Sequence, residues 1–112
     1  MTELVGFAGQ IGPEHISQVV EKGFKSIINN RPDFEGGSNQ PTSAAIEQAA
    51  SAAGLSYVFQ PVVSGQITEQ DVHDFAEHYN QLSKPILMFC RTGNRCSNLY
   101  QLAKQMDLLD DE

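Results

Sequence analysis

The sequence has little positive charge. Seven lysines and arginines stand against fourteen aspartates and glutamates, so the 112-residue chain carries a formal net charge of −7. Such a chain repels nucleic acid and anionic membrane surfaces, and we expect neither as a partner. Two of the seven basic residues, Arg91 and Arg95, flank a single glycine, Gly93, which indicates a local role for their charge.

Cysteine is equally scarce. The only two cysteines, Cys90 and Cys96, lie six positions apart where a loop is expected to run into a helix, which favours free thiols over a structural disulfide. Residues 1–6 carry neither a basic stretch nor a long apolar run, so the sequence signals neither secretion nor membrane insertion. We therefore expect a cytoplasmic protein.

The chain shows no internal repeat and no linker, and its length predicts one domain over residues 1–112. Short apolar runs predict strands over residues 4–8, 24–28, 55–59 and 85–89. Helical patterns begin near residues 13, 43, 68 and 95 and end by residues 23, 54, 82 and 106. This alternation predicts a three-layer α/β fold, with a mainly parallel central sheet of about four or five strands flanked by helices.

Two long polar loops follow predicted strands. Residues 29–41 leave the second strand, and residues 60–67 leave the third. Ligands of open α/β sheets bind at the carboxyl ends of the strands, so residues Arg31 and Asp33 of the first loop are candidates for the rim of a site.

The most informative segment runs from Cys90 to Cys96, directly after the apolar run 85–89. A strand, a tight loop and a helix N-terminus would point backbone N–H groups and the positive end of the helix at one place. Such a cradle binds an oxyanion and lowers the pKa of a thiol inside it. Cys90 is therefore the candidate nucleophile, and the candidate anion-binding residues are Arg91, Thr92, Gly93, Asn94, Arg95, Cys96 and Arg31.

The loop Cys90–Arg95 resembles the active-site loop of rhodanese-type sulfurtransferases. Together with residues 24–33 and 54–63, it makes the chain from about residue 10 to residue 106 resemble the phosphatase-like domain of beta-lactamase-hydrolase-like proteins. This resemblance implies the fold of dual-specificity and tyrosine phosphatases, and an enzyme that works through a cysteine thiolate without metal or organic cofactor. It also implies a partner enzyme of sulfide metabolism.

The family has been described both as phosphatases and as sulfurtransferases, and loop length bears on the choice. Four residues separate Cys90 from Arg95, as in rhodanese, whereas tyrosine phosphatases have five. Phe89 and Cys96 occupy the positions where those phosphatases place His and Ser or Thr. Residues 60–65, where the relatives carry their general acid, contain no carboxylate, which leaves Asp33 as the candidate acid.

These departures favour a sulfurtransferase that takes sulfane sulfur from a small anionic donor and carries it as a Cys90 persulfide. The alternative is a phosphatase that acts on a phosphorylated substrate through a Cys90 phosphocysteine, with Arg95 binding the phosphate oxygens. A further alternative is a redox sensor based on Cys90 and Cys96, or a binding module. The sequence leaves open the role of Cys96 and the oligomeric state.

Overall fold

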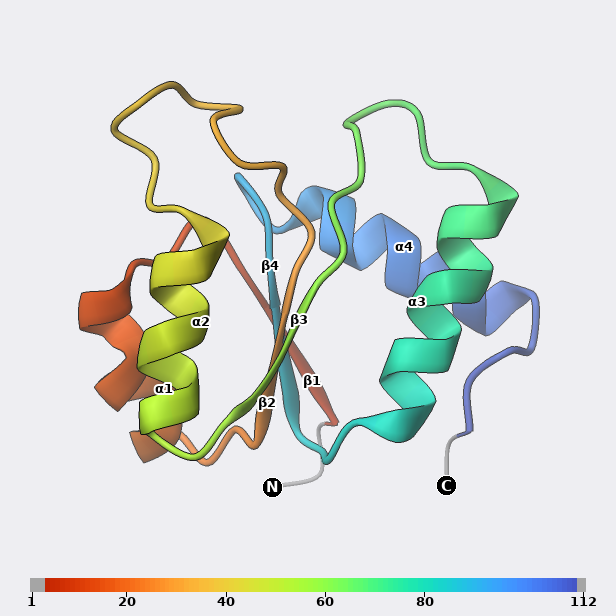
Figure 1. Cartoon of the computed structure of the whole chain (residues 1–112). Coiled ribbons are helices and arrows are strands. Elements are labelled where there is room, and N and C mark those ends of the chain that lie inside the picture. The colour runs from red at the N-terminus through yellow and green to blue at the C-terminus, as the bar shows by residue number, and fades with distance from the viewer. Residues whose placement is uncertain (1–3, 111–112) are drawn as a thin grey trace.

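The computed structural model describes residues 4–110 of the chain (Figure 1). Its strands are β1 (Val5–Ala8), β2 (Ser26–Asn29), β3 (Ser56–Phe59) and β4 (Ile86–Phe89). The helices are a 3-10 turn η1 (Pro13–His15), α1 (Ile16–Glu21), α2 (Ser43–Ala52), α3 (Glu69–Gln81) and α4 (Asn94–Gln105). Each predicted element is present, with bounds that move by a few residues. None of the helices in the described part of the chain is long and apolar enough to cross a membrane.

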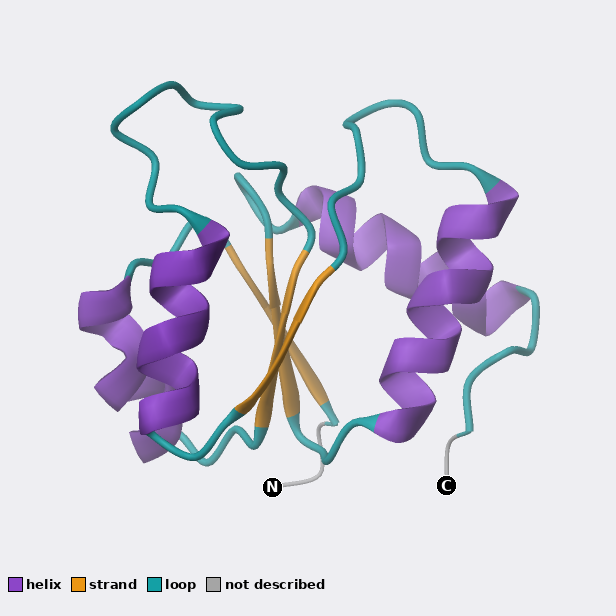
Figure 2. Ribbon diagram, viewed as in Figure 1, coloured by secondary structure: helices purple, strands orange, loops and turns teal. Residues whose placement is uncertain are grey.

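The sheet has four strands in the order β1-β4-β2-β3, and every neighbouring pair is parallel. Helices α1 and α2 cover one face of this sheet, and α3 and α4 cover the other (Figures 1 and 2). The structure therefore confirms the three-layer α/β fold and the parallel sheet. Four strands are observed, at the lower end of the predicted range.

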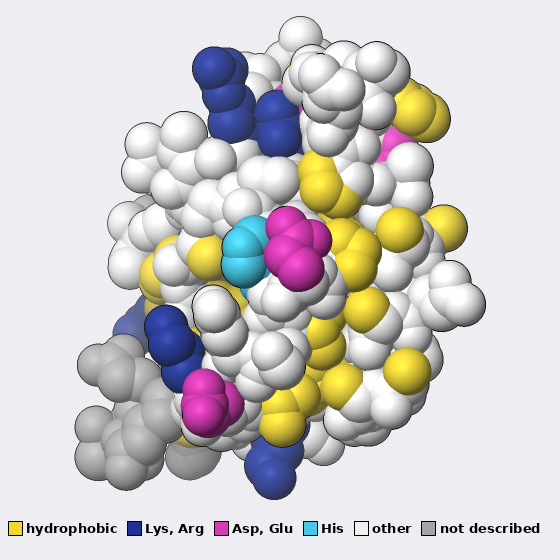
Figure 3. Space-filling model, turned by 90° about the vertical axis from the view of Figure 1, so that its left-hand side faces the viewer, with side chains coloured by type: hydrophobic (Ala, Val, Ile, Leu, Met, Phe, Trp, Pro, Cys, Tyr) yellow, Lys and Arg dark blue, Asp and Glu magenta, His cyan; other side chains and the backbone are white. Residues whose placement is uncertain are grey.

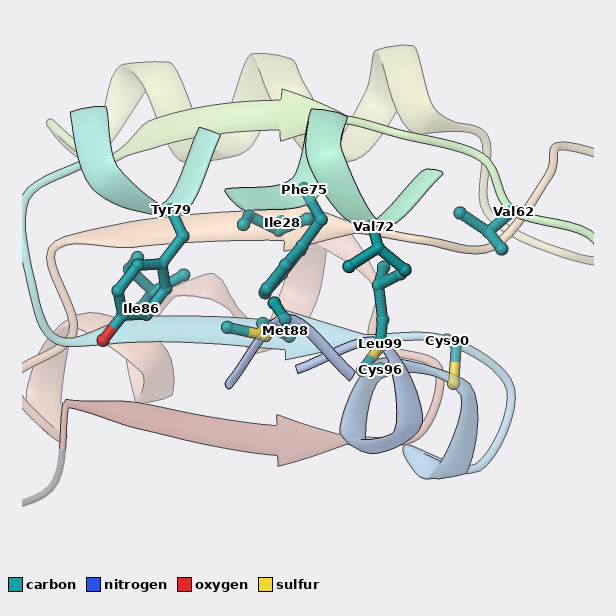
Figure 4. Close-up of a cluster of buried hydrophobic side chains, with 11 residues drawn as sticks. Ile28, Val62, Val72, Phe75, Tyr79, Ile86, Met88, Cys90, Cys96 and Leu99 are labelled. Carbon is teal, nitrogen blue, oxygen red and sulfur yellow. The ribbon is translucent and has the colours of Figure 1, made fainter. Parts of the chain in front are cut away.

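The central strands are apolar on both sides because each side meets a layer of helices. Ile28, Ile86 and Met88 belong to the core cluster beneath α3 and α4, whereas Ile27 and Leu87 belong to the cluster beneath α1 and α2. This arrangement explains the nearly continuous apolar run of β4. Figure 4 shows the first cluster, with Tyr79 at one end and the two cysteines at the other.

Local capping explains where two helices begin. Thr42 Oγ1 accepts a hydrogen bond from the backbone N–H of Ala45, at the start of α2. At the start of α3, the backbone N–H of Asp71 donates to Thr68 Oγ1, and the backbone N–H of Thr68 donates to the Asp71 carboxylate. This is the capping box expected from Thr68 and Asp71, with the shorter acid in the third position.

All three strands that matter for the site end at the same edge of the sheet. The loops that follow β2, β3 and β4 emerge together there, as Figure 2 shows at the top of the molecule. Hydrogen bonds join these loops: the backbone N–H of Asn30 donates to the carbonyl of Phe89, and that of Val62 donates to the carbonyl of Asn30. The fold thus holds three loops, distant in sequence, against one another.

Candidate active site

Cys90 lies immediately beyond β4, and only 1% of its surface is exposed. Its Sγ accepts a hydrogen bond from the backbone N–H of Gly93 at 3.1 Å. Gly93 has a φ of 91°, a left-handed conformation that turns the chain into α4 and suits glycine. The predicted cradle of strand, tight loop and helix N-terminus is therefore present around the Cys90 sulfur.

The environment of Cys90 stabilises its thiolate. A hydrogen bond from the Cys96 side chain has the largest effect, and backbone N–H groups of Cys96, Thr92 and Gly93 add to it. Although burial opposes them, these contacts lower the pKa of Cys90 to about 4. At neutral pH the Cys90 thiol is therefore ionised, which is the form that a nucleophilic role requires.

Cys96 has the opposite character. Its hydrogen bond to Cys90, together with burial, raises the pKa of the Cys96 thiol far above its usual range. Cys96 is fully buried in the first turn of α4 and packs in the core cluster beneath α3 and α4. Cys96 is therefore a core residue whose side chain also donates a hydrogen bond to the candidate nucleophile.

Arg95 holds the three loops together at the site. One terminal nitrogen, Nη1, donates to the backbone carbonyls of Asn30 at 3.3 Å and Val62 at 2.9 Å. The other, Nη2, donates to Glu35 Oε1 at 3.1 Å. The side chain is buried, and its Nε has no hydrogen-bond partner among the described residues. Arg95 thus keeps its Nε donor unpaired.

Glu35 is a site residue that the sequence analysis missed. Its Oε1 accepts hydrogen bonds from Arg95 and from Arg31 Nε, the latter at 2.9 Å. Burial raises the pKa of the Glu35 carboxyl, but the bonds and charges of the two arginines outweigh it and hold that pKa below its usual range. The available signal was the spacing of four residues between Arg31 and Glu35 on a loop already assigned to the rim.

A pocket of about 380 Å³ opens beside Cys90. Of the predicted site residues, it brings together Cys90, Arg91, Thr92, Asn94 and Arg95, and its other lining residues are Glu35, Ser64, Gly65, Ile67 and Asn98. Arg91 is exposed at this pocket, whereas Arg31 is buried, donates to Gln10 and Glu35, and is not among the residues that line it.

Asp33 lies at the start of α2. Its Oδ1 accepts a hydrogen bond from the backbone N–H of Ser43 at 2.8 Å, and the residue is not among those that line the Cys90 pocket. The structure therefore shows a structural contact for Asp33, and its role as a general acid stays a prediction. The carboxylate that does line the pocket is Glu35.

A larger groove, of about 460 Å³, lies between β1 and α1. Figure 3 shows hydrophobic side chains gathered on this side of the molecule, and Phe7, Val19 and Phe24 are among the lining residues. No cysteine or carboxylate is present among the described residues that line it. The candidate nucleophile, Cys90, lines the smaller pocket instead. Within residues 4–110 no cluster of three metal-ligating side chains occurs.

Residues 1–107 match the family described as "Beta-lactamase hydrolase-like protein, phosphatase-like domain". The chain belongs to this family. Curated relatives called beta-lactamase hydrolase-like protein, from Xylella fastidiosa and Agrobacterium fabrum, are 36% identical over 107 residues. These matches cover 96% of the chain but 25% of each relative, so the chain spans about a quarter of their length. The resemblance stated from the sequence is confirmed.

Solved structures agree with this assignment. A candidate phosphatase from Neisseria meningitidis is 35% identical, with a TM-score of 0.85 over 94% of this chain and 74% of the other. The core catalytic domain of a PP-IP phosphatase from S. cerevisiae, crystallised with citrate, gives a TM-score of 0.67 over 92% of this chain and 61% of the other at 18% identity, which shows the common fold. The chain thus has the phosphatase-like fold expected for its family. The main prediction from the sequence was sulfur transfer. The names of these relatives support the alternative, a phosphatase, better.

Proposed function

We propose that this domain is a cysteine-dependent phosphatase in which the Cys90 thiolate attacks phosphorus. The observation that carries the proposal is the Cys90 sulfur itself, with its pKa lowered to about 4 and its backbone N–H contacts beside a buried arginine. The relatives named as phosphatases support the same conclusion. No other cysteine among the described residues combines this thiolate character with a pocket.

The chemistry would proceed in two steps. Attack by Cys90 forms a sulfur–phosphorus bond and breaks the bond between phosphorus and the ester oxygen, which leaves as an alcohol after taking up a proton. Water then attacks phosphorus, the sulfur–phosphorus bond breaks, and phosphate and the Cys90 thiolate are released. Backbone N–H groups of the loop and the spare Nε donor of Arg95 are suited to the charge that develops on the phosphoryl oxygens.

The leaving oxygen must take up a proton unless it leaves as a stable anion. Glu35 is the only carboxylate among the described residues that line the pocket, and its lowered pKa leaves it ionised at neutral pH. An ionised carboxylate cannot donate that proton. Esters of acidic alcohols, such as aryl phosphates, are therefore the expected substrates, because their oxygens leave without an acid.

Sulfur transfer is the second candidate function, and two observations favour it. Only four residues separate Cys90 from Arg95, and a sulfur transfer needs no general acid for an anionic leaving group such as sulfite. In this reaction Cys90 attacks the outer sulfur of thiosulfate, a new sulfur–sulfur bond forms, and the old one breaks to release sulfite. Cyanide then removes the outer sulfur as thiocyanate and restores the thiolate.

One comparison tests both functions. Phosphate release from 4-nitrophenyl phosphate and thiocyanate formation from thiosulfate and cyanide are measured with the wild-type protein and with Cys90→Ser. The proposal expects phosphate release that Cys90→Ser abolishes. Cys90-dependent thiocyanate formation without phosphate release would replace the phosphatase by the sulfurtransferase. Loss of neither activity in Cys90→Ser would refute a nucleophilic role for Cys90.

A further inference from the structure

The Cys90 pocket does not end at the catalytic loop. It shares the residues Gly65, Ile67 and Asn98 with a second concavity, of about 450 Å³, between the loop after β3 and the outer face of α4. This second concavity is lined further along α4 by Gln101, Leu102 and Gln105. The two therefore form one continuous groove, called the α4 groove below, that leads away from the nucleophile.

Four carboxamide side chains follow this groove. Asn94, Asn98, Gln101 and Gln105 are separated by four, three and four residues, a spacing that places them on one face of α4. All four residues are exposed, and their side chains form no hydrogen bond to another residue within 4–110. Each carboxamide therefore has a free donor and a free acceptor for a ligand.

Charge is confined to one end of the groove. The charged lining residues are Glu35, Arg91 and Arg95, and all of them lie in the Cys90 pocket rather than in its extension. The positive charge of Arg95 is already paired with the carboxylate of Glu35. A ligand with several phosphates would find few free cations here, whereas a ligand with one anionic group and an uncharged, hydrogen-bonding body matches the surface.

We propose that the α4 groove binds an extended polypeptide segment whose phosphorylated side chain enters the Cys90 pocket. This inference rests on the proposed phosphatase function. From Asn94 to Gln105 the helix rises about 16 Å at 1.5 Å per residue, and an extended chain rises about 3.3 Å per residue. The groove thus has room for about five residues, whose backbone N–H and C=O groups pair with the carboxamides.

The test compares two substrates with the same leaving group. One substrate is a six-residue peptide of otherwise uncharged residues that carries phosphotyrosine at one end, prepared in both chain directions, and the other is phenyl phosphate. In Gln101→Ala and in Gln105→Ala, we expect the ratio of kcat/KM for the peptide to that for phenyl phosphate to fall about fivefold, the effect of one lost hydrogen bond. Alanine favours the helix, so both variants should fold. Gln48→Ala, on the exposed side of α2, is the matched control and should leave the ratio unchanged.

Binding separates this inference from the function on which it rests. Calorimetry with Cys90→Ser measures peptide affinity without turnover, and adding Gln101→Ala should weaken it by the same factor. If the wild-type protein hydrolyses neither substrate but the peptide binds in this pattern, the phosphatase function is refuted and peptide binding in the α4 groove is supported. If phenyl phosphate is hydrolysed but the ratio and the affinity do not respond to Gln101 or Gln105, the groove is refuted and the phosphatase stands.

Discussion

The guanidinium of Arg95 and the carboxylate of Glu35 form an ion pair at 3.1 Å, and both residues line the Cys90 pocket. These residues are 60 positions apart in the sequence and come from α4 and from the loop after β2. The pair orients the arginine, but its negative charge also opposes the binding of an anionic substrate. We therefore expect the pair to limit how strongly the pocket attracts anions.

Glu35→Gln should tighten the binding of inorganic phosphate. Removing a charge near the anion site relieves a repulsion of roughly 0.7 kcal/mol or more, which is about threefold in affinity. The measurement is the inhibition constant of phosphate at low ionic strength. Glu47→Gln makes the same charge change on the exposed side of α2 and serves as the control. An inhibition constant that rises in Glu35→Gln would show that orientation of Arg95 outweighs the charge.

Cys96→Ala should raise the pKa of Cys90, because it removes the contact that lowers this pKa most. A hydrogen bond to a charged group contributes about 1.5–3 kcal/mol, which corresponds to about one to two pKa units. The rate of alkylation by iodoacetamide against pH reports the thiolate fraction of Cys90, and its midpoint should move to higher pH. Cys96→Ser keeps a donor and should move it less. Equal midpoints in all three proteins would contradict the role assigned to Cys96.

Ionisation of Cys90 should also make stability depend on pH. Its folded pKa is about 4, whereas a thiol in an unfolded chain has a pKa of about 8.5. Between these values the unfolded chain binds a proton that the folded chain does not, so this contribution is fully present above pH 8.5, roughly, and is lost as the pH falls through about 4. Urea unfolding of the wild-type protein at pH 8 and pH 5.5 should show a larger loss of stability than Cys90→Ser shows. The same loss in both proteins would exclude a depressed pKa.

Asp33 can be tested for its two roles separately. Asp33→Ala removes the acceptor for the Ser43 N–H at the start of α2, and we expect a loss of about 1 kcal/mol in the free energy of unfolding. Asp33→Asn keeps an oxygen acceptor there but cannot act as an acid. Its kcat for an alkyl phosphate is compared with its kcat for 4-nitrophenyl phosphate. A selective loss with the alkyl ester would establish Asp33 as the general acid, and equal rates would leave it the structural role alone.

Most of the fold could be predicted from local patterns. The apolar run before Cys90 predicted a central strand, and the pairing of Thr68 with Asp71 predicted the start of α3. Each of these signals consists of residues that lie within a few positions of one another in the sequence. Likewise, Gly93 and the helix that follows Cys90 predicted the cradle around the sulfur. The strand order β1-β4-β2-β3 could not be predicted from such local patterns, because it depends on contacts between segments that are distant in the sequence.

The sequence by itself determined that Cys90 stands in a tight loop at the N-terminus of a helix, because that arrangement is local to residues 85–96. Only the tertiary structure decided the partners of this loop. It placed Glu35 against Arg95, tied that arginine to the carbonyls of Asn30 and Val62, and left Asp33 at the start of α2. The physical reason is the parallel sheet, which gathers the carboxyl ends of β2, β3 and β4 at one edge and so brings three separate loops into contact.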